Sequence, residues 1–588
     1  MKMFPFLREN METLDQQGQM IVAWLAAKKP DEQRIKDGLF VNRHGLIDWR
    51  LPSGLGMFEQ VPPQAFYSDW NGGSKPDTSA TILVGCNVGY GLNRLLTNTP
   101  DSHKIVVVEP NPELLLACLG QTDFRPFLEH KKLHFALPED DYLGEVIKNL
   151  DLQYIYGVIN LRADLPSQQM GPEYASLLAR IKGRVENFCV EMNTLRSRQD
   201  VMVGNELKNF HRALSDGSLA GLEGSARGVT AVILGAGPSL LRFAPEFVRD
   251  PGYALYATAL QTMPTLQAQG VTPHFCLAID YDPGMLKIFD RLDLERAATV
   301  PLIYSTKVQP ELVRRYPGPT IPLWTIGGVA TFAMKDRELV LDAGGNVSLT
   351  LTRFLHWCGV SRLLLAGQDF AWSGEQTHAD GHHAAGRKVV FNPRAHLRIK
   401  NLHGEEIITS PQYMAAKREL EMDLRKTDLP VFGLYGGGAP IEGVEMLDMA
   451  QVRARGLLTS APGSVESFRG KLLASRERRR SFDFEPRSPR WSSSLRHAEK
   501  QLTKLFRNLG GNQKEIHGLF EQALLFIKQD PLYVPYLFNE IINLSGLAKA
   551  RHSYEPKDLA EFRRIEKDVL RKVREVDRCL LPAGSRAA

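Results

Sequence analysis

AVILGAGPSL, residues 231–240, is the stretch that decides the fold of this chain. Its apolar residues predict a buried strand that ends in a glycine turn. Pro238 suits the first position of a helix, so a helix is predicted to begin directly after the turn. Gly235 and Gly237 lack a Cβ atom, so backbone N–H groups at that helix start can approach a phosphate closely, and Ser239 can add a hydroxyl. The turn predicts a strand–turn–helix unit with either a nucleotide at its tip or no ligand at all.

The strand–turn–helix rhythm recurs in two separate parts of the chain. In the first part, strands are predicted at 81–85, 104–110, 133–140 and 154–160. In the second part, strands are predicted at 231–235, 253–259, 274–280, 300–305, 321–326 and 361–367. Strands that alternate with helices imply a parallel, doubly wound sheet. The predicted fold class is therefore α/β, with two Rossmann-like doubly wound domains and a C-terminal helical domain.

Composition divides the chain into four predicted parts. These are an N-terminal Rossmann-like domain at 1–164, a helical connector at 165–228, a central α/β domain at 229–470, and a basic linker with a C-terminal helical domain at 471–588. The connector has apolar residues at a spacing near 3.6, which indicates helix. Basic residues gather at 475–490, which we interpret as a solvated linker, with a patch for an acidic partner as the alternative.

Composition excludes several classes of protein. No apolar run approaches the roughly 20 residues that a membrane helix needs, and the N-terminus has no clear signal-peptide core, so we expect a cytoplasmic protein without a membrane span. None of the six cysteines forms a CxxC pair, which favours buried thiols in a reducing compartment. No nucleic-acid-binding motif is present in the sequence, so no nucleic-acid partner is expected.

A second glycine turn, GCNVGYG, follows the strand predicted at 81–85. Glu109 stands at the end of the next strand, near the place of the acidic residue that binds a ribose in dinucleotide domains. Glycines at such a junction also serve packing alone, and no catalytic motif accompanies this turn. A bound nucleotide and a purely structural turn both stay open here.

Several polar residues that could bind a ligand follow the central glycine turn. Thr258 and Asp280 stand at the carboxyl ends of the next two strands, where side chains of an open α/β sheet face a ligand crevice, although capping of the strand end is equally consistent for Asp280. Asn346 and Ser348 open a later helix and offer a second set of N–H donors. Each of these residues is a candidate for donor binding.

Another group of candidates follows the strand predicted at 361–367. Gly367 and Asp369 belong to the motif GQDF, and a loop with His378, His382 and His383 comes next. One of these histidines could act as a general base, since histidine titrates near neutral pH. A surface loop and a metal site built with Asp380 are the two alternatives for the histidines, and a strand-end cap is the alternative for Asp369.

Six motifs in this order resemble the central domain of the motility-associated factor (Maf) family of bacterial flagellin glycosyltransferases and the related 6-hydroxymethylpterin pyrophosphokinase (MptE-like) domain. They are GAGPSL, GVTPHFCLAIDYDP, GGNVSLTLTRFL, LLAGQDFAW, THADGHH and GGGAPIEG. The resemblance covers roughly residues 200–445 and departs from the family at LYGGG, where a Thr-Glu pair is commoner. GAGPSL and GQDFAW also resemble motifs of bacterial sialyltransferases that use CMP-sialic acid.

The resemblance implies transfer of a nonulosonic acid, such as pseudaminic or legionaminic acid, from a CMP-activated donor to Ser or Thr of flagellin. It implies that Gly235, Gly237, Pro238, Ser239, Thr258, Asp280, Asn346, Ser348 and Gly367 contact the donor, and that His378, His382, His383 or Asp369 acts in catalysis. No cofactor is required, although a divalent metal stays open.

Two other functions remain as alternatives. One is a pyrophosphokinase that moves diphosphate from ATP to a hydroxymethylpterin, with Mg²⁺ held by Asp280 and Asp282. The other is a non-enzymatic assembly factor that binds a nucleotide sugar and holds a partner through its helical tail.

Overall fold

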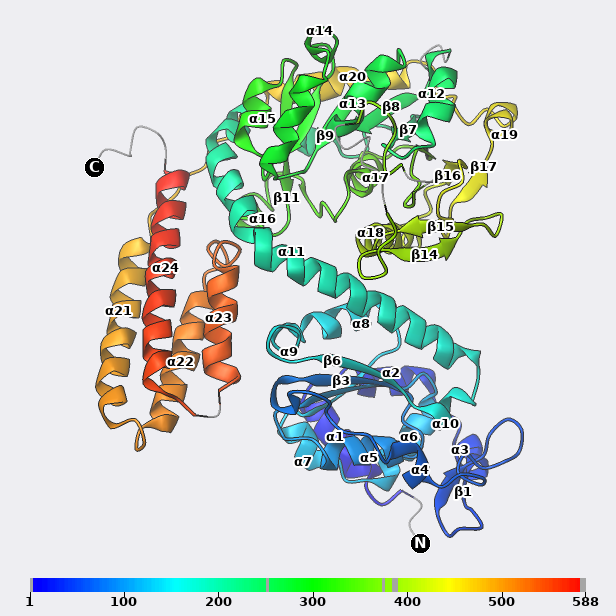
Figure 1. Cartoon of the computed structure of the whole chain (residues 1–588), viewed down its shortest axis with the longest axis vertical. Coiled ribbons are helices and arrows are strands. Elements are labelled where there is room, and N and C mark those ends of the chain that lie inside the picture. The colour runs from blue at the N-terminus through cyan, green and yellow to red at the C-terminus, as the bar shows by residue number, and fades with distance from the viewer. Residues whose placement is uncertain (1–3, 250–252, 373–375, 383–389, 552, 582–588) are drawn as a thin grey trace. The chain divides into compact units, whose positions relative to one another are not determined.

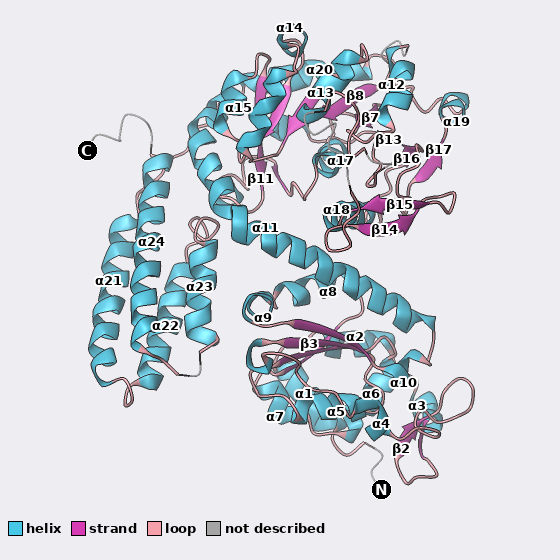
Figure 2. Cartoon of the chain, in the orientation of Figure 1, coloured by secondary structure: helices cyan, strands magenta, loops and turns pink. Residues whose placement is uncertain are grey.

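The computed structural model describes residues 4–249, 253–372, 376–382, 390–551 and 553–581 of the chain (Figure 1). The chain forms two compact units. The first contains Met1–Met192 and Ile542–Tyr554, and the second contains Asn193–Ile541 and Glu555–Ala588. Each unit holds a parallel sheet with helices around it, and Figure 2 distinguishes strands from helices. The predicted fold class, α/β with two such domains and C-terminal helices, is confirmed.

The sheet of the first unit has four parallel strands. Their order is β5 (Leu133–Ala136), β4 (Lys104–Val108), β3 (Ala80–Val84) and β6 (Ile159–Ala163). The main helices are α1 (Leu7–Gln16), α2 (Ile21–Lys28), α3 (Glu32–Gly38), α4 (Pro63–Tyr67), α5 (Tyr90–Thr97), α6 (Pro112–Gln121), α7 (Arg125–Glu129), α8 (Asp140–Lys148) and α10 (Leu165–Gln168). An antiparallel pair, β1 (Leu39–Val41) with β2 (Ile47–Trp49), precedes the sheet. Strand order reverses between β3 and β6.

The strand predicted at 154–160 is wrong in its first half. Residues Tyr154 to Tyr156 end helix α9 (Asp151–Tyr156), and β6 begins only at Ile159. The N–H of Gly157 donates to the carbonyl of Gln153, which closes the last helical turn. A short apolar run fits a strand and a helix equally well, so the sequence pattern could not separate the two.

Helix α11 (Pro172–Asp216) is a single helix of 45 residues in the region predicted to be helical. Its residues up to Met192 belong to the first unit, and the rest belongs to the second. The three boundaries between the four predicted parts stay a prediction.

Nine parallel strands form the sheet of the second unit. Their order is β12 (Val340–Leu341), β11 (Thr320–Thr325), β10 (Leu302–Ser305), β9 (Phe275–Ala278), β8 (Leu255–Ala259), β7 (Thr230–Leu234), β13 (Arg362–Ala366), β16 (Val431–Leu434) and β17 (Glu445–Leu447). The chain builds the sheet outward from β7 to β12 and then returns to the other side of β7 as β13. Strand order thus reverses between β7 and β13, and ligands of open α/β sheets bind at the carboxyl end of such a reversal.

Successive residues of β7 face opposite sides of this sheet, as the period of two requires. Ala231 and Ile233 join a core that contains α17 (Val347–Trp357), α18 (Pro411–Leu424) and α20 (Ser464–Ala474). Val232 and Leu234 join the opposite core with α12 (Leu240–Val248), α13 (Met263–Ala268) and α19 (Met449–Ala454). Helices α14 (Leu294–Ala297), α15 (Pro310–Arg315) and α16 (Ala330–Ala333) and the hairpin of β14 (Leu397–Lys400) and β15 (Glu406–Thr409) complete the α/β part. A continuous run of apolar residues in β7 therefore reflects a strand that is covered on both faces.

The segment VGNELKNF of α11 fastens this helix to the sheet. The Asn205 side-chain amide donates to carbonyls of the loops after β9 and β10, at 3.2 and 3.1 Å. The Asn209 amide donates to two further carbonyls after β10, both at 2.9 Å. The buried Glu206 accepts from the N–H of Val329, after β11, at 2.8 Å. One helix thus holds the carboxyl ends of three strands.

The segment interpreted as a solvated linker is partly attached to the second unit. Arg480 pairs with Glu338 at 2.7 Å, and its N–H donates to the carbonyl of Leu214 at 2.8 Å. The Phe482 ring lies against Phe210, with 5.3 Å between ring centroids. These contacts hold this part of the basic segment on the protein surface.

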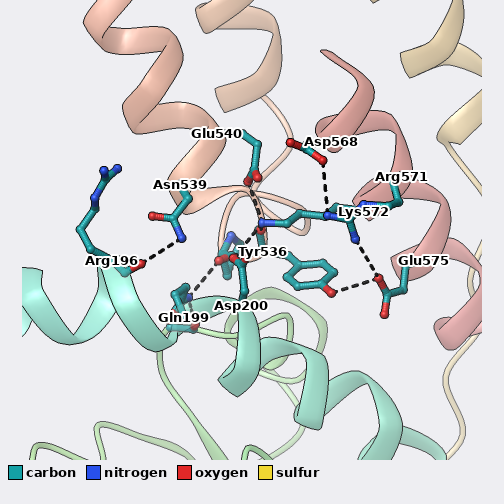
Figure 3. Close-up of polar contacts among 12 residues, drawn as sticks. Arg196, Gln199, Asp200, Tyr536, Asn539, Glu540, Asp568, Arg571, Lys572 and Glu575 are labelled. Atoms are coloured by element: carbon teal, nitrogen blue, oxygen red, sulfur yellow. Dashed lines mark hydrogen bonds and ion pairs between the residues drawn. The ribbon is translucent and has the colours of Figure 1, made fainter. Parts of the chain in front are cut away.

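Helices α21 (Ser488–Leu505), α22 (Gln513–Lys528), α23 (Phe538–Lys549) and α24 (Pro556–Leu580) form the C-terminal part. Lys572 of α24 is 1 % exposed and donates to Asp200 of α11 at 2.7 Å, to Glu540 at 2.8 Å and to the Tyr536 carbonyl at 2.9 Å (Figure 3). A buried ammonium needs such partners, because an unpaired charge in the protein interior is strongly unfavourable. This contact attaches α24 to the part of α11 that belongs to the second unit.

Replacing Lys572 with Met is therefore expected to destabilise the C-terminal helices by about 3–5 kcal/mol, because the buried Glu540 loses its counter-charge. Hydrogen exchange of the α24 amides should accelerate accordingly. Lys567→Met changes an exposed lysine of the same helix and should alter stability by no more than about 0.5 kcal/mol. Equal exchange rates in the two variants would contradict the assigned role of Lys572.

Candidate functional site

The carboxyl ends of β7 and β13 meet backbone against backbone. The N–H of Gly235 donates to the carbonyl of Ala366 at 2.7 Å, and the N–H of Gly237 donates to the carbonyl of Gly367 at 2.9 Å. A Cβ atom on Gly235 would lie 2.5 Å from the Gly367 oxygen, and one on Gly367 would lie 2.5 Å from the Gly235 oxygen. Only glycine fits at either position. These two N–H groups are engaged within the protein, so the turn provides space at the crevice rather than free donors.

Asp369, which follows β13, forms hydrogen bonds to the glycine turn that follows β7. Its carboxylate accepts from the N–H of Ser239 at 2.9 Å and from the Ser239 hydroxyl at 2.5 Å. Burial raises the pKa of Asp369, while the two hydrogen bonds from Ser239 act in the opposite direction. The Ser239 side chain makes no cap to α12, so its hydroxyl serves the bond to Asp369. Gly436 of the LYGGG loop packs directly on Ser239, where a larger residue would collide.

The start of α17 forms a second wall. The Asn346 side chain accepts from the N–H of Ser348 at 2.8 Å and so caps the helix. The Gln368 amide donates to the Ser348 hydroxyl at 2.5 Å and passes over Gly235, where a Cβ atom would collide with it. The helix start and the GQDF motif are thereby joined at the mouth of the crevice.

The histidine loop forms a third wall. His378 and His382 stack in parallel, with 4.1 Å between ring centroids and 4° between ring planes. The Nε2 atom of His378 lies 3.4 Å from the hydroxyl of Tyr413, on α18. The N–H of Ala379 donates to the carbonyl of Ala236 at 2.9 Å, which attaches the loop to the glycine turn. The predicted His383 lies outside the described residues.

A cavity of about 150 Å³ lies between these walls. Eight predicted site residues line it: Gly235, Gly237, Asn346, Ser348, Gly367, Asp369, His378 and His382. Elements far apart in the sequence therefore converge on one small polar space at the reversal between β7 and β13.

Four predicted site residues are not among those that line this cavity. Pro238 and Ser239 follow the three turn residues that line the cavity. Thr258 is fully buried, and its hydroxyl donates to the Leu234 carbonyl at 2.7 Å. Asp280 accepts from the N–H of Asp282 at 3.0 Å, in the loop after β9. Their predicted contact with the donor stays a prediction.

Sequence reasoning missed five polar residues of the cavity: Gln261, Thr262, Gln368, Thr377 and Tyr413. Gln368 stands inside the recognised GQDF motif, and Gln261 and Thr262 follow β8 after Leu260, so position after a strand end could have indicated these three. Thr377 opens the recognised THADGHH motif. Tyr413 comes from a helix that follows the β14–β15 hairpin, and no local pattern marks it.

The other glycine turn, at the end of β3, is filled by the side chains of its own unit. The Asn87 amide donates to Asp164 at 2.8 Å, and the Tyr67 hydroxyl donates to the same carboxylate at 2.8 Å. A Cβ atom on Gly85 would lie 2.5 Å from the side chain of Ser167. These contacts favour the structural interpretation of this turn.

Glu109, the candidate ribose ligand of that turn, is also engaged. It accepts from the Tyr174 hydroxyl, from the N–H of Cys86 at 2.8 Å and from the N–H of Asn111 at 3.0 Å. It is 1 % exposed, and burial raises its pKa to about 7. This carboxyl is a component of the core of the first unit.

Within the described residues, no group of three or more His, Cys, Asp or Glu side chains is arranged to hold a metal ion. In the same part of the chain, no helix combines the length and apolar character needed to cross a bilayer.

Two family models match the chain. The glycosyltransferase Maf N-terminal domain matches residues 68–140, and the model described as 6-hydroxymethylpterin diphosphokinase MptE-like matches residues 204–375. A solved structure of a Maf glycosyltransferase from Magnetospirillum magneticum AMB-1 is similar with a TM-score of 0.59 and 16 % identity, over 98 % of this chain and 96 % of that chain. No curated protein sequence matches the chain.

The chain thus carries one segment similar to the N-terminal domain of glycosyltransferase Maf and another similar to an MptE-like domain. Over nearly its whole length it shares the fold of a Maf glycosyltransferase. The predicted resemblance to the Maf family and to the MptE-like domain is confirmed. The predicted likeness of GAGPSL and GQDFAW to sialyltransferase motifs stays a prediction. The MptE-like match ends at residue 375 and so includes the glycine turn, the start of α17 and GQDF.

Gly237→Ala should lower stability by about 1–3 kcal/mol, because the added methyl group meets the Asp369 carboxylate and forces a shift in a packed region. Gly470→Ala is the matched control, since no atom lies within 4 Å of the added group in helix α20 and alanine favours a helix. Thermal unfolding measures both. A Gly237→Ala protein as stable as the control would contradict the close approach described here.

Glu109 should make stability dependent on pH. The folded chain keeps the Glu109 proton up to its pKa of about 7, whereas the unfolded chain releases it near the ordinary value of 4.5. Because the folded state binds more protons between these values, the free energy of unfolding falls as pH rises through this window, by up to about 3 kcal/mol. Glu109→Gln should lack this fall. The melting temperature of the variant minus that of wild type should therefore increase from pH 5 to pH 8. Parallel curves for the two proteins would refute the assignment, and Glu129→Gln, at an exposed position, serves as control.

Proposed function

We propose that this chain transfers a nonulosonic acid, such as pseudaminic or legionaminic acid, from a CMP-activated donor to Ser or Thr of flagellin in the cytoplasm. The observation that carries the proposal is the polar cavity at the reversal between β7 and β13, built from the GAGPSL turn, the start of α17 and the GQDF motif. The Maf match supports the same class of reaction. The proposal needs no resident cofactor.

The donor's phosphate belongs at the start of α17 in this proposal. A helix of 11 residues begins at Val347, and its positive end and first N–H groups favour an anion. Asn346, Val347 and Ser348 line the cavity there. Gly235 and Gly237, which have no side chains, leave room for the donor to approach the sheet.

The reaction itself needs one proton acceptor. The acceptor hydroxyl oxygen forms a bond to the anomeric carbon of the sugar, while the bond from that carbon to the phosphate oxygen breaks with its electron pair and CMP leaves. The hydroxyl proton passes to a base, a role that we assign to His378, because imidazole accepts protons near neutral pH and this residue lines the cavity. Tyr413 and His382 hold the His378 ring in place.

The MptE-like match favours one second candidate, transfer of diphosphate from ATP to 6-hydroxymethylpterin with Mg²⁺. Asp280 and Asp282, the carboxylates considered for the metal, accept from N–H groups of their own loop at 3.0 and 2.7 Å and are not among the cavity residues. An assay with ATP, Mg²⁺ and 6-hydroxymethylpterin, with and without EDTA, decides between the candidates. EDTA-sensitive pterin diphosphate formation would replace the glycosyltransferase proposal.

CMP should raise the melting temperature of the protein more than CDP, ATP, GDP or S-adenosylmethionine, because a ligand that binds only the folded state stabilises it. His378→Ala should lower transfer to flagellin by about 10²–10⁴-fold, the usual contribution of a general base, and leave the CMP-induced shift intact. His517→Ala, at a half-exposed histidine of α22, is the control and should transfer normally. Full activity of His378→Ala would remove His378 as the base.

A further inference from the structure

Gln261 and Thr262, which follow β8 after Leu260, carry polar atoms that the protein does not use. Both residues line the cavity. Among the described residues, the Oε1 atom of Gln261 and the Oγ1 atom of Thr262 are buried and have no hydrogen-bond partner. More than nine in ten buried polar groups in folded proteins have such a partner, so two exceptions side by side in one cavity call for an explanation.

Local structure does not explain these two atoms. Thr262 precedes α13, where a threonine hydroxyl ordinarily accepts a hydrogen bond from the helix, yet no such side-chain cap is present. Thr262 is fully buried. The Nε2 atom of Gln261 lies 3.3 Å from the sulfur of Met285. The amide oxygen of Gln261 is therefore the side-chain atom without a hydrogen-bond partner. Both oxygens therefore keep an unused capacity for hydrogen bonding in residues of the cavity wall.

We propose that Gln261 and Thr262 select the ligand of this cavity by hydrogen bonding. A hydroxyl or amino group of the ligand donates to Gln261 Oε1, and Thr262 Oγ1 donates to or accepts from the same part of the ligand. This inference rests on the proposed function, in which the ligand is a CMP-activated sugar acid. Such a donor carries suitable groups at both ends, the amino group of cytosine and the hydroxyl groups of the sugar.

Thr265 provides an internal comparison. It lies in α13, three residues beyond Thr262, and it is likewise fully buried with an unpartnered hydroxyl. It is not among the residues that line the cavity. Replacing either threonine with valine removes a buried unpaired hydroxyl at nearly constant volume, so both variants should fold and should melt at or above the wild-type temperature in the absence of ligand.

Isothermal titration of the full chain with CMP and with CMP-N-acetylneuraminic acid tests the proposal. Thr262→Val and Gln261→Met should each weaken binding by about 10-fold or more, because a ligand group loses its partner on burial. Thr265→Val should bind like wild type. Weakening toward both probes assigns the contact to the nucleotide, and weakening toward the sugar nucleotide alone assigns it to the sugar.

Three results would overturn the inference, and they differ in whether the proposed CMP donor is overturned as well. If Thr262→Val and Gln261→Met bind both probes as wild type does, the ligand does not use these atoms, while the CMP donor remains valid. If wild type binds neither probe, the donor assignment itself is wrong and the inference is wrong with it. Equal weakening in Thr265→Val would also refute it, since the effect would then come from packing of α13.

Discussion

The close approach of Gly235 and Gly367 is the constraint on which the site depends. Each residue would place a Cβ atom 2.5 Å from the backbone oxygen of the other, so two neighbouring strand ends meet without side chains between them. Strand order reverses at this same point, so the crevice that an open sheet forms there begins at bare backbone. Every other wall of the cavity is built around that contact.

The side chains next to this contact supply polar groups, which glycine does not have. Asp369 accepts hydrogen bonds from the N–H and the hydroxyl of Ser239, and the Gln368 amide passes over Gly235 and donates to the Ser348 hydroxyl. The buried carboxyl of Asp369 and the half-buried amide of Gln368 thus fix three segments of distant sequence with respect to one another. The polar groups closest to the turn serve its geometry, which leaves ligand contact to the helix start, the histidine loop and the residues after β8.

Periodicity and glycine turns predicted three strands of the first sheet, part of its fourth and six of the nine strands of the second, because strand ends and turns leave a signal in the local sequence. The short strands β12, β16 and β17 were not predicted. The sequence could not show that Asp164 and Tyr67 fill the other glycine turn, since that depends on residues distant in the chain. Tyr413 was missed for the same reason. The helix at Tyr154 was mistaken for strand because a short apolar run has no distinctive period.

The first unit contains residues from both ends of the chain, Met1–Met192 and Ile542–Tyr554, and Tyr156 donates to the carbonyl of Ile542 at 3.1 Å. Proteins are made from the N-terminus, and domains generally fold as units while synthesis proceeds. Here the ribosome completes the entire central sheet before it delivers the last segment of the first unit. That unit therefore reaches its final packing only near the end of translation, after residues 542–554 have been made.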